Sequence, residues 1–139
     1  MDALLINPNS RAKVYQSLGS ELAAVEPPVW SGLIATFLRD RGWSVKILDA
    51  EAESLALEET VDKVRLMRPK LVSVIVYGQQ PSASTQNMTA AGELCQAIKR
   101  RLPDQKILMG GLHPSALPER TMQEEAVDFV SQGEGPYTI

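Results

Sequence analysis

Short apolar runs alternate with helical patterns along this chain, and that alternation constrains its fold more than any other feature. Five runs have the length of a β-strand, at residues 3–7, 44–49, 71–77, 106–109 and 127–131. Strands separated by helical segments are typical of βαβ units around a parallel sheet. We therefore predict an α/β fold, a doubly wound, five-stranded parallel sheet of the flavodoxin-like or Rossmann-like kind, in the order 2-1-3-4-5. The length of 139 residues fits a single domain over 1–139.

The helical patterns between these runs have recognisable ends and faces. In the first helix, Val29, Leu33 and Phe37 recur every four residues, and Ser54 is expected to cap the second. The apolar face of the third consists of residues at helical spacing: Met88, Ala91, Cys95, Ile98 and Leu102. Pro118 is predicted to open a short fourth helix.

Composition and charge argue against several classes of function. The 14 basic and 17 acidic residues give a net charge of -3, with no Lys/Arg stripe, which argues against a nucleic-acid partner. The longest apolar runs are far too short to span a bilayer. The first residues lack the features of a secretory signal, and the single cysteine, Cys95, permits no internal disulfide. We therefore expect a cytoplasmic protein.

In a sheet of this kind, ligands bind beyond the carboxyl ends of the strands. Glycine, proline and small polar residues gather in the loops that follow the five runs, whereas the loops at the opposite ends are plain connections. The loop at 8–27 is much longer than a usual connection, so a functional role is favoured there over a disordered insertion.

Several known functions of this fold require residues that this sequence lacks. A dinucleotide site would need G-x-G-x-x-G in the first loop, which is absent, although Asp49 stands where a ribose-binding acid would lie. A phosphate-accepting receiver domain would need an aspartate where Tyr77 and Gly78 stand. Hydrolytic triads and zinc sites cannot be assembled from His113 and Cys95 alone. We predict no catalytic residue and no metal ligand in this chain.

Two consecutive glycines and the only histidine follow the fourth run. We expect Gly110 and Gly111 at the exit of the strand, where their missing side chains would let a bulky or flat ligand approach the sheet. His113 precedes Pro114 and is expected to be extended, with its imidazole as a hydrogen-bonding wall of the site. A purely structural histidine is the alternative.

Four segments together resemble a known family: NP after the first run, EPPVWSGLIATFLRDRGWSVKILDAEAE, GGLHPSALPE and VDFVSQGEG. They are similar to the N-terminal cobalamin-binding domain of cobalamin-dependent radical S-adenosylmethionine (SAM) proteins. That group includes methyltransferases and the anaerobic magnesium-protoporphyrin IX monomethyl ester oxidative cyclases. The resemblance implies a cobalamin (vitamin B12) across the carboxyl edge of the sheet, with its nucleotide tail between strands and helices.

The expected cofactor-binding residues lie in these segments and in the loops at the same edge: Asn7, Pro8, Asp49, Ser73, Tyr77, Gly78, Gln79, Ser82, Gly110, Gly111, His113, Pro114, Gly133 and Glu134. The wider family carries D-x-H-x-x-G after the first strand, with a histidine that ligates cobalt, and NPNSRAK departs from it. The resemblance to the radical branch therefore implies base-off binding without a histidine ligand. Tyr77, Gly78 or Gln79 are the expected neighbours of the lower corrin face.

The resemblance also implies a partner module in the same polypeptide, which carries C-x-x-x-C-x-x-C for a [4Fe-4S] cluster and uses S-adenosylmethionine. A chain with one cysteine cannot hold that cluster. We therefore expect these residues to be the N-terminal part of a longer enzyme, a methyltransferase or an oxidative cyclase, and not to be catalytic alone.

Two alternatives stay open at this point. The same fold without a cofactor would serve as a docking or substrate-recognition module, and a flavodoxin-like domain would bind a nucleotide or flavin. The double glycine, together with the small residues Ser82, Ala83 and Ser84, favours a ligand, because a module without one has no need of open volume there.

Overall fold

The structure, a computed structural model, describes residues 1–11, 13, 25–77, 81–133 and 135–139. Five strands form one sheet: β1 (Ala3–Asn7), β2 (Val45–Asp49), β3 (Leu71–Val76), β4 (Lys106–Gly111) and β5 (Phe129–Val130). All paired neighbours are parallel, and the order is β2-β1-β3-β4-β5. The predicted α/β class and strand order are confirmed.

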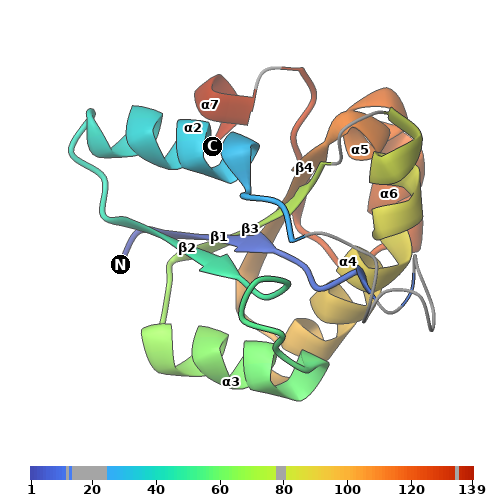
Figure 1. The fold of residues 1–139 in the computed structure, drawn as a ribbon, viewed down its shortest axis with the longest axis horizontal. Coiled ribbons are helices and arrows are strands. Elements are labelled where there is room, and N and C mark those ends of the chain that lie inside the picture. The colour runs from blue at the N-terminus through green and yellow to red at the C-terminus, as the bar shows by residue number, and fades with distance from the viewer. Residues whose placement is uncertain (12, 14–24, 78–80, 134) are drawn as a thin grey trace.

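Helices cover both faces of the sheet (Figure 1). One face carries α2 (Val29–Arg39) and α7 (Gly135–Thr138), which contact each other, and the other carries α3 (Leu57–Met67) and α4 (Pro81–Arg101). Two short helices, α5 (Leu112–Ala116) and α6 (Pro118–Glu124), follow β4. Because α2 follows β1 in the chain, it begins at the carboxyl edge of the sheet and runs back along it.

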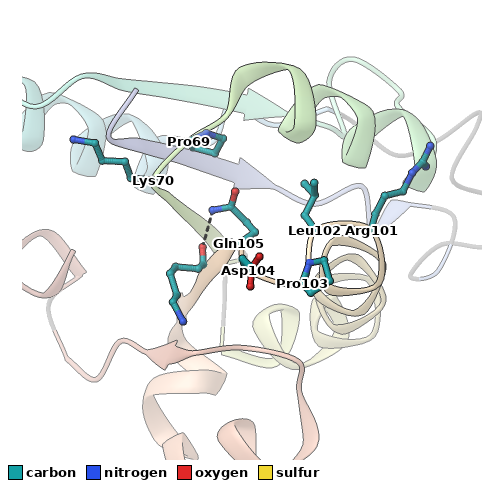
Figure 2. A pocket seen from close by; sticks show the side chains of 8 residues that line it. Pro69, Lys70, Arg101, Leu102, Pro103, Asp104 and Gln105 are labelled. Carbon is teal, nitrogen blue, oxygen red and sulfur yellow. Dashed lines mark hydrogen bonds between the residues drawn. The ribbon is translucent and has the colours of Figure 1, made fainter.

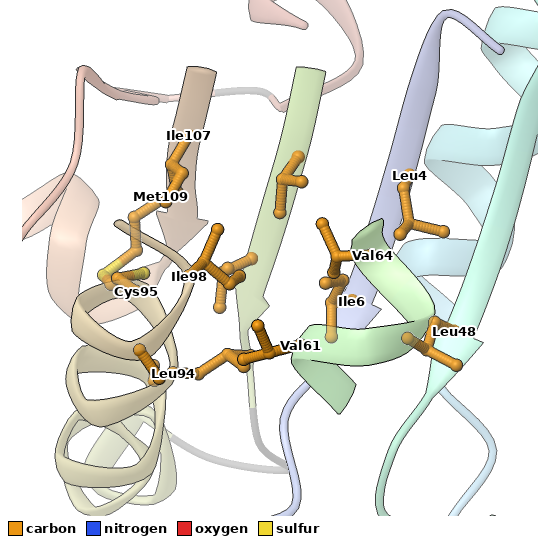
Figure 3. Packing of buried hydrophobic residues seen from close by; sticks show 14 of the residues in the cluster. Leu4, Ile6, Leu48, Val61, Val64, Leu94, Cys95, Ile98, Ile107 and Met109 are labelled. Atoms are coloured by element: carbon orange, nitrogen blue, oxygen red, sulfur yellow. The ribbon is translucent and has the colours of Figure 1, made fainter. Parts of the chain in front are cut away.

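The larger core lies between the sheet and the α3/α4 layer. Figure 3 shows side chains of the strands, such as Ile6 and Met109, packed against Val61 and Val64 of α3 and Ile98 of α4. These five side chains are fully buried. Burial of each such side chain contributes about 1.5–3 kcal/mol, so this layer supplies most of the hydrophobic stabilisation. A smaller core joins α2 to the other face of the sheet.

Helix α2 packs with a different face from the one that its four-residue repeat marks. Val29 and Leu33 are 58% and 55% exposed. The buried residues are on the neighbouring stripe: Ser31, Ile34, Ala35 and Leu38. Both stripes are apolar at helical spacing, so α2 leaves an apolar surface outside the core.

Helix α3 begins without Ser54, which was expected to cap it. Ser54 lies before the helix with a φ of 51°. The carboxylate of Glu59 accepts a hydrogen bond from the Ala56 backbone N–H at 2.8 Å and satisfies that donor instead. A glutamate at the third helical position is well placed for this contact.

The segment after β4 also differs from the expected one. Gly110 and Gly111 belong to β4 and do not follow it, because they pair with Ile75 and Val76 of β3. His113 is helical, not extended, since Pro114 falls in the first turn of α5, where its missing N–H costs no helical hydrogen bond. The predicted fourth helix begins at Pro118 as α6.

Within the part of the chain that the structure describes, no helix combines the length and apolar character that crossing a membrane requires. Cys95 is a buried free thiol in the α4 core. Burial raises the pKa of the Cys95 thiol, and the negative charge of Glu125 raises it further by a smaller amount. It is therefore a core residue and not a nucleophile.

Candidate functional site at the carboxyl edge of the sheet

Asn7 and Asp49 close the ends of β1 and β2. They are paired in register, and the Asn7 Nδ2 group donates a hydrogen bond to Asp49 Oδ1 at 2.9 Å. The same oxygen accepts the backbone N–H of Ala52 at 3.0 Å. Pro8, which follows Asn7, is buried. The predicted residues Asn7, Pro8 and Asp49 therefore lie together, and the Asp49 Oδ1 atom is already bonded within the protein.

Tyr77 follows the last residue of β3 and is held from two sides. Its ring stacks on Trp30 of α2, with ring centroids 5.0 Å apart and planes 22° apart. Its backbone carbonyl accepts a hydrogen bond from Asn87 Nδ2 of α4 at 3.0 Å. Nothing in the sequence pattern singled out Trp30, because its proximity to Tyr77 arises only from the packing of α2 on β3.

The missing side chain of Gly111 lets β4 pack closely against β3 and does not open space for a ligand. Its φ is +151° and its ψ is 177°, a region that is essentially restricted to glycine. A Cβ atom built on Gly111 would overlap the backbone carbonyl of Val76. The expectation that its missing side chain makes room for a ligand is therefore not what the structure shows: the space is filled by β3.

Gly110 differs from its neighbour. A Cβ atom there would lie 3.5 Å from the Cβ atom of Ser131 and 4.0 Å from Ile75 Cδ1, which is ordinary contact. Ile75 belongs to the core beneath α2. Gly110 therefore faces the α2/α7 side of the sheet, and an added side chain would project into that layer.

Two buried hydroxyl groups on this side have no hydrogen-bond partner among the described residues. The Oγ atoms of Ser73 in β3 and Ser131 after β5 are both unpaired, and the residues are 0% and 2% exposed. Ser73 shares the α2/α7 face with Ile75, two residues along the strand, and Ser131 lies beside Gly110. An unpaired buried hydroxyl costs about 1–3 kcal/mol, so a pair on one face indicates a missing polar partner. Ser73 was predicted, but Ser131 was not.

A network of small polar groups joins α4 to α5 at the same edge. The Ser84 hydroxyl donates to the Val76 carbonyl at 2.5 Å and accepts the backbone N–H of His113 at 3.1 Å. The Thr85 hydroxyl and His113 Nδ1 are 2.9 Å apart. The predicted Ser82 is exposed on the first turn of α4, and Pro114 is buried.

The last predicted residues follow β5. Gly133 has a left-handed φ of +79°, and its backbone N–H donates to the Ser115 hydroxyl at 2.9 Å. This bond ties the segment after β5 to α5. Gly78, Gln79 and Glu134 lie outside the described residues.

No group of three or more histidine, cysteine, aspartate or glutamate side chains within the described ranges could hold a metal ion. A hollow of about 370 Å³ lies at the opposite, amino edge of the sheet (Figure 2). Three cations line it, and each is already paired with a carboxylate: Lys70 with Asp2, Arg101 with Glu58 and Lys106 with Asp128. The cations that line this hollow are therefore neutralised within the protein, and the carboxyl edge is the better candidate.

Comparison with known proteins identifies the family. The model of the B12 binding domain matches residues 15–139. The chain belongs to the B12-binding domain family. This membership favours cobalamin over the flavin or nucleotide alternative, and it agrees with the resemblance seen in the sequence.

Curated relatives are longer proteins of two kinds. The anaerobic magnesium-protoporphyrin IX monomethyl ester cyclase of Rubrivivax gelatinosus is 28% identical over 137 residues, which are 97% of this chain and 22% of that protein. The corresponding cyclase of Synechocystis sp. is 29% identical over 141 residues and an uncharacterized methyltransferase of Pyrococcus horikoshii 27% over 140. Both matches span all of this chain, but only 26% and 28% of those proteins.

Solved structures share the fold. The radical S-adenosylmethionine methyltransferase TsrM of Kitasatospora setae, solved with cobalamin and a [4Fe-4S] cluster, superposes with a TM-score of 0.72 at 24% identity. The match covers 99% of this chain and 23% of TsrM. The cobalamin-dependent radical enzyme OxsB superposes at 0.71 with 16% identity and covers 99% of this chain and 17% of OxsB. At these identities the likeness establishes the fold.

Proposed function

We propose that this domain binds cobalamin across the carboxyl edge of its sheet, with the nucleotide tail of the cofactor between the sheet and the α2/α7 layer. The observation that carries the proposal is the pair of unpaired hydroxyls of Ser73 and Ser131, which lie on that face on either side of β4 and Gly110. A tail with ribose and phosphate oxygens would supply the partners that the described residues do not. Gly110 keeps the intervening position free of a side chain.

The residues around this face would orient the cofactor in distinct ways. Ser73 and Ser131 would hydrogen-bond the tail, and the bonded Asn7–Asp49 pair would border the corrin over β1 and β2. His113, held by Thr85, would form a wall beyond β4. When bound, cobalamin supplies cobalt-centred methyl transfer or radical chemistry, and the protein supplies its position.

The lower face of the corrin would have no histidine ligand. The chain contains one histidine, and it lies after β4 rather than after β1, where the wider family carries its ligating residue. Tyr77, with Gly78 and Gln79, is our candidate for the lower-face neighbours. A base-off cobalamin is the expected bound form.

We place the domain in a larger cobalamin-dependent radical SAM enzyme, a methyltransferase or oxidative cyclase, with a downstream module in the same polypeptide that holds a [4Fe-4S] cluster and S-adenosylmethionine. Support comes from the cyclases and the methyltransferase that it resembles, of whose length the chain spans 22–28%. In this proposal residues 1–139 form one cofactor module and carry no catalytic residue. The cytoplasm is the proposed compartment, because the single cysteine is a free thiol.

The test is an anaerobic titration of the chain with hydroxocobalamin, followed through the corrin absorption bands. Ser73→Ala and Ser131→Ala should each weaken binding by about 3- to 15-fold, as for the loss of one hydrogen bond to a polar or charged group. Thr60→Val is the matched control, since the hydroxyl of Thr60 in α3, on the other face, is also buried but donates a hydrogen bond to the Ala56 carbonyl. If both serine variants bind hydroxocobalamin with wild-type affinity, the nucleotide tail does not bind on this face.

A further inference from the structure

Trp30 stands half-exposed beside the carboxyl edge, with one ring face against Tyr77. Its exposure is 49%, and the two rings lie nearly parallel at a centroid distance of 5.0 Å. We propose that the indole of Trp30 is a contact surface for the conjugated macrocycle of the cofactor. This inference rests on the proposed function and adds a residue to it that neither the sequence pattern nor the predicted site contains.

The row of side chains on β3 links the buried hydroxyls to this ring. Ser73, Ile75 and Tyr77 alternate along the chain and so point to the same side of the sheet. Ser73 is fully buried, whereas Tyr77 is half-buried beyond the last residue of the strand. Trp30, in the first turn of α2, continues the row outward.

A tail bound at Ser73 leaves the α2/α7 layer past Tyr77 and Trp30, because these rings flank its carboxyl-edge end. The macrocycle is covalently attached to the tail and is too large for a closely packed layer, so it must lie outside. That requirement places it beside the exposed part of Trp30. The position follows from the chain's own geometry once the tail is assigned to this face.

The chemistry of the exposed surface suits a flat, partly apolar ring system. Val29 and Leu33, 58% and 55% exposed, extend the apolar surface of Trp30 along α2. An indole offers a large, rigid contact face with few rotatable bonds, so its ordering on binding costs little. Tyr77 already restrains the ring, and the Asn87 hydrogen bond restrains the backbone of Tyr77.

The chain offers a matched control, because its second tryptophan lies far from this edge. Trp43 is 53% exposed and sits between α2 and β2, at the amino edge. We would measure hydroxocobalamin affinity for the wild type, Trp30→Ala, Trp30→Phe and Trp43→Ala, with far-UV circular dichroism of each. Trp30→Ala should weaken binding at least fivefold, Trp30→Phe less, and Trp43→Ala by less than twofold.

The outcomes separate this inference from the proposed function. Saturable wild-type binding with the same affinity in Trp30→Ala and Trp43→Ala would overturn the role of Trp30 and leave the cobalamin site standing. Absence of saturable wild-type binding would overturn both. If Trp30→Ala loses its native circular dichroism, Trp30→Phe decides: affinity equal to the wild type would contradict a contact of the indole, and a weakened affinity would support it.

Discussion

Gly111 lies so close to Val76 that a Cβ atom on the glycine would overlap the valine carbonyl oxygen. The two residues are paired in register at the carboxyl ends of β4 and β3. The contact fixes how closely the strands approach at the point where the ligand edge begins. One of the two consecutive glycines is therefore demanded by the sheet itself, independently of any cofactor.

Replacement of Gly111 by alanine should destabilise the fold. The φ of +151° and the overlap with Val76 each oppose a side chain, and we expect a loss of about 3 kcal/mol in the free energy of unfolding. Gly110→Ala, whose Cβ would meet only ordinary contacts, should lose less than about 1 kcal/mol. Urea denaturation of the two variants measures the difference. Equal losses would mean that β4 relaxes away from Val76.

Removal of either unpaired hydroxyl should stabilise the cofactor-free domain. Ser73→Ala and Ser131→Ala each remove a buried polar atom that has no partner among the described residues, and a gain of up to about 1 kcal/mol is expected. Ser84→Ala should have the opposite sign, because the Ser84 hydroxyl bonds both Val76 and His113. Thermal unfolding without cobalamin provides the comparison. Destabilisation by both Ser73→Ala and Ser131→Ala would show that these hydroxyls are already satisfied.

His113→Ala should leave the corrin spectrum of bound cobalamin unchanged. The ring is held through Nδ1 by the Thr85 hydroxyl and is expected to border the ligand as a wall. Affinity should fall by a factor of a few, about 1 kcal/mol, as for one hydrogen bond. Absorption spectra of the wild-type and variant complexes check this. A shift of the cobalamin bands in the variant would instead identify His113 as a cobalt ligand.

Acid should weaken the amino edge of the sheet through Asp128. Partial burial raises the pKa of this carboxyl group, but the ammonium of Lys99, the backbone N–H of Ile107 and the ammonium of Lys106 lower it more, from 3.8 to about 2. Because the pKa in the folded state is depressed, the stabilisation is fully present above about pH 4 and is lost as the pH falls toward 2.

The free energy of unfolding, measured by urea titration from pH 5 to pH 2, tests this dependence. Asp128→Asn should be less stable than the wild type at pH 5 and should lose less stability on acidification. Lys99→Gln should reduce the same dependence, since its ammonium lies 2.7 Å from Asp128 Oδ2. Parallel curves for the wild type and Asp128→Asn would rule out a depressed pKa.

The sheet was predictable from the sequence because its strands are short, continuous apolar runs separated by helices. The same logic failed at α2, where the four-residue repeat of Val29 and Leu33 marks one apolar stripe and Ile34 and Leu38 lie on another. Periodicity defines stripes but does not decide which one packs. It also could not reveal Ser131, since an unpaired hydroxyl is recognised only by burial, nor Trp30, whose partner Tyr77 is 47 positions away along the chain.

The residues at the carboxyl edge were more predictable as a set than in their roles. The end-of-strand rule brought Asn7, Asp49 and Tyr77 to one edge, as the structure shows. Roles depend on packing distances that no pattern carries. Gly111 was expected to open space and instead contacts Val76, while Gly110 faces the layer with the unpaired hydroxyls.

The proposed tail site can be tested most directly by comparing cobalamin with cobinamide, the corrin that lacks the nucleotide tail, in anaerobic titrations of this chain. We expect saturable binding of hydroxocobalamin with a base-off spectrum, and an affinity for cobinamide at least tenfold weaker, because only cobalamin has a tail that can reach Ser73 and Ser131. Absence of saturable cobalamin binding up to about 1 mM, a binding free energy weaker than about -4 kcal/mol, would contradict it. So would equal affinities for the two corrins.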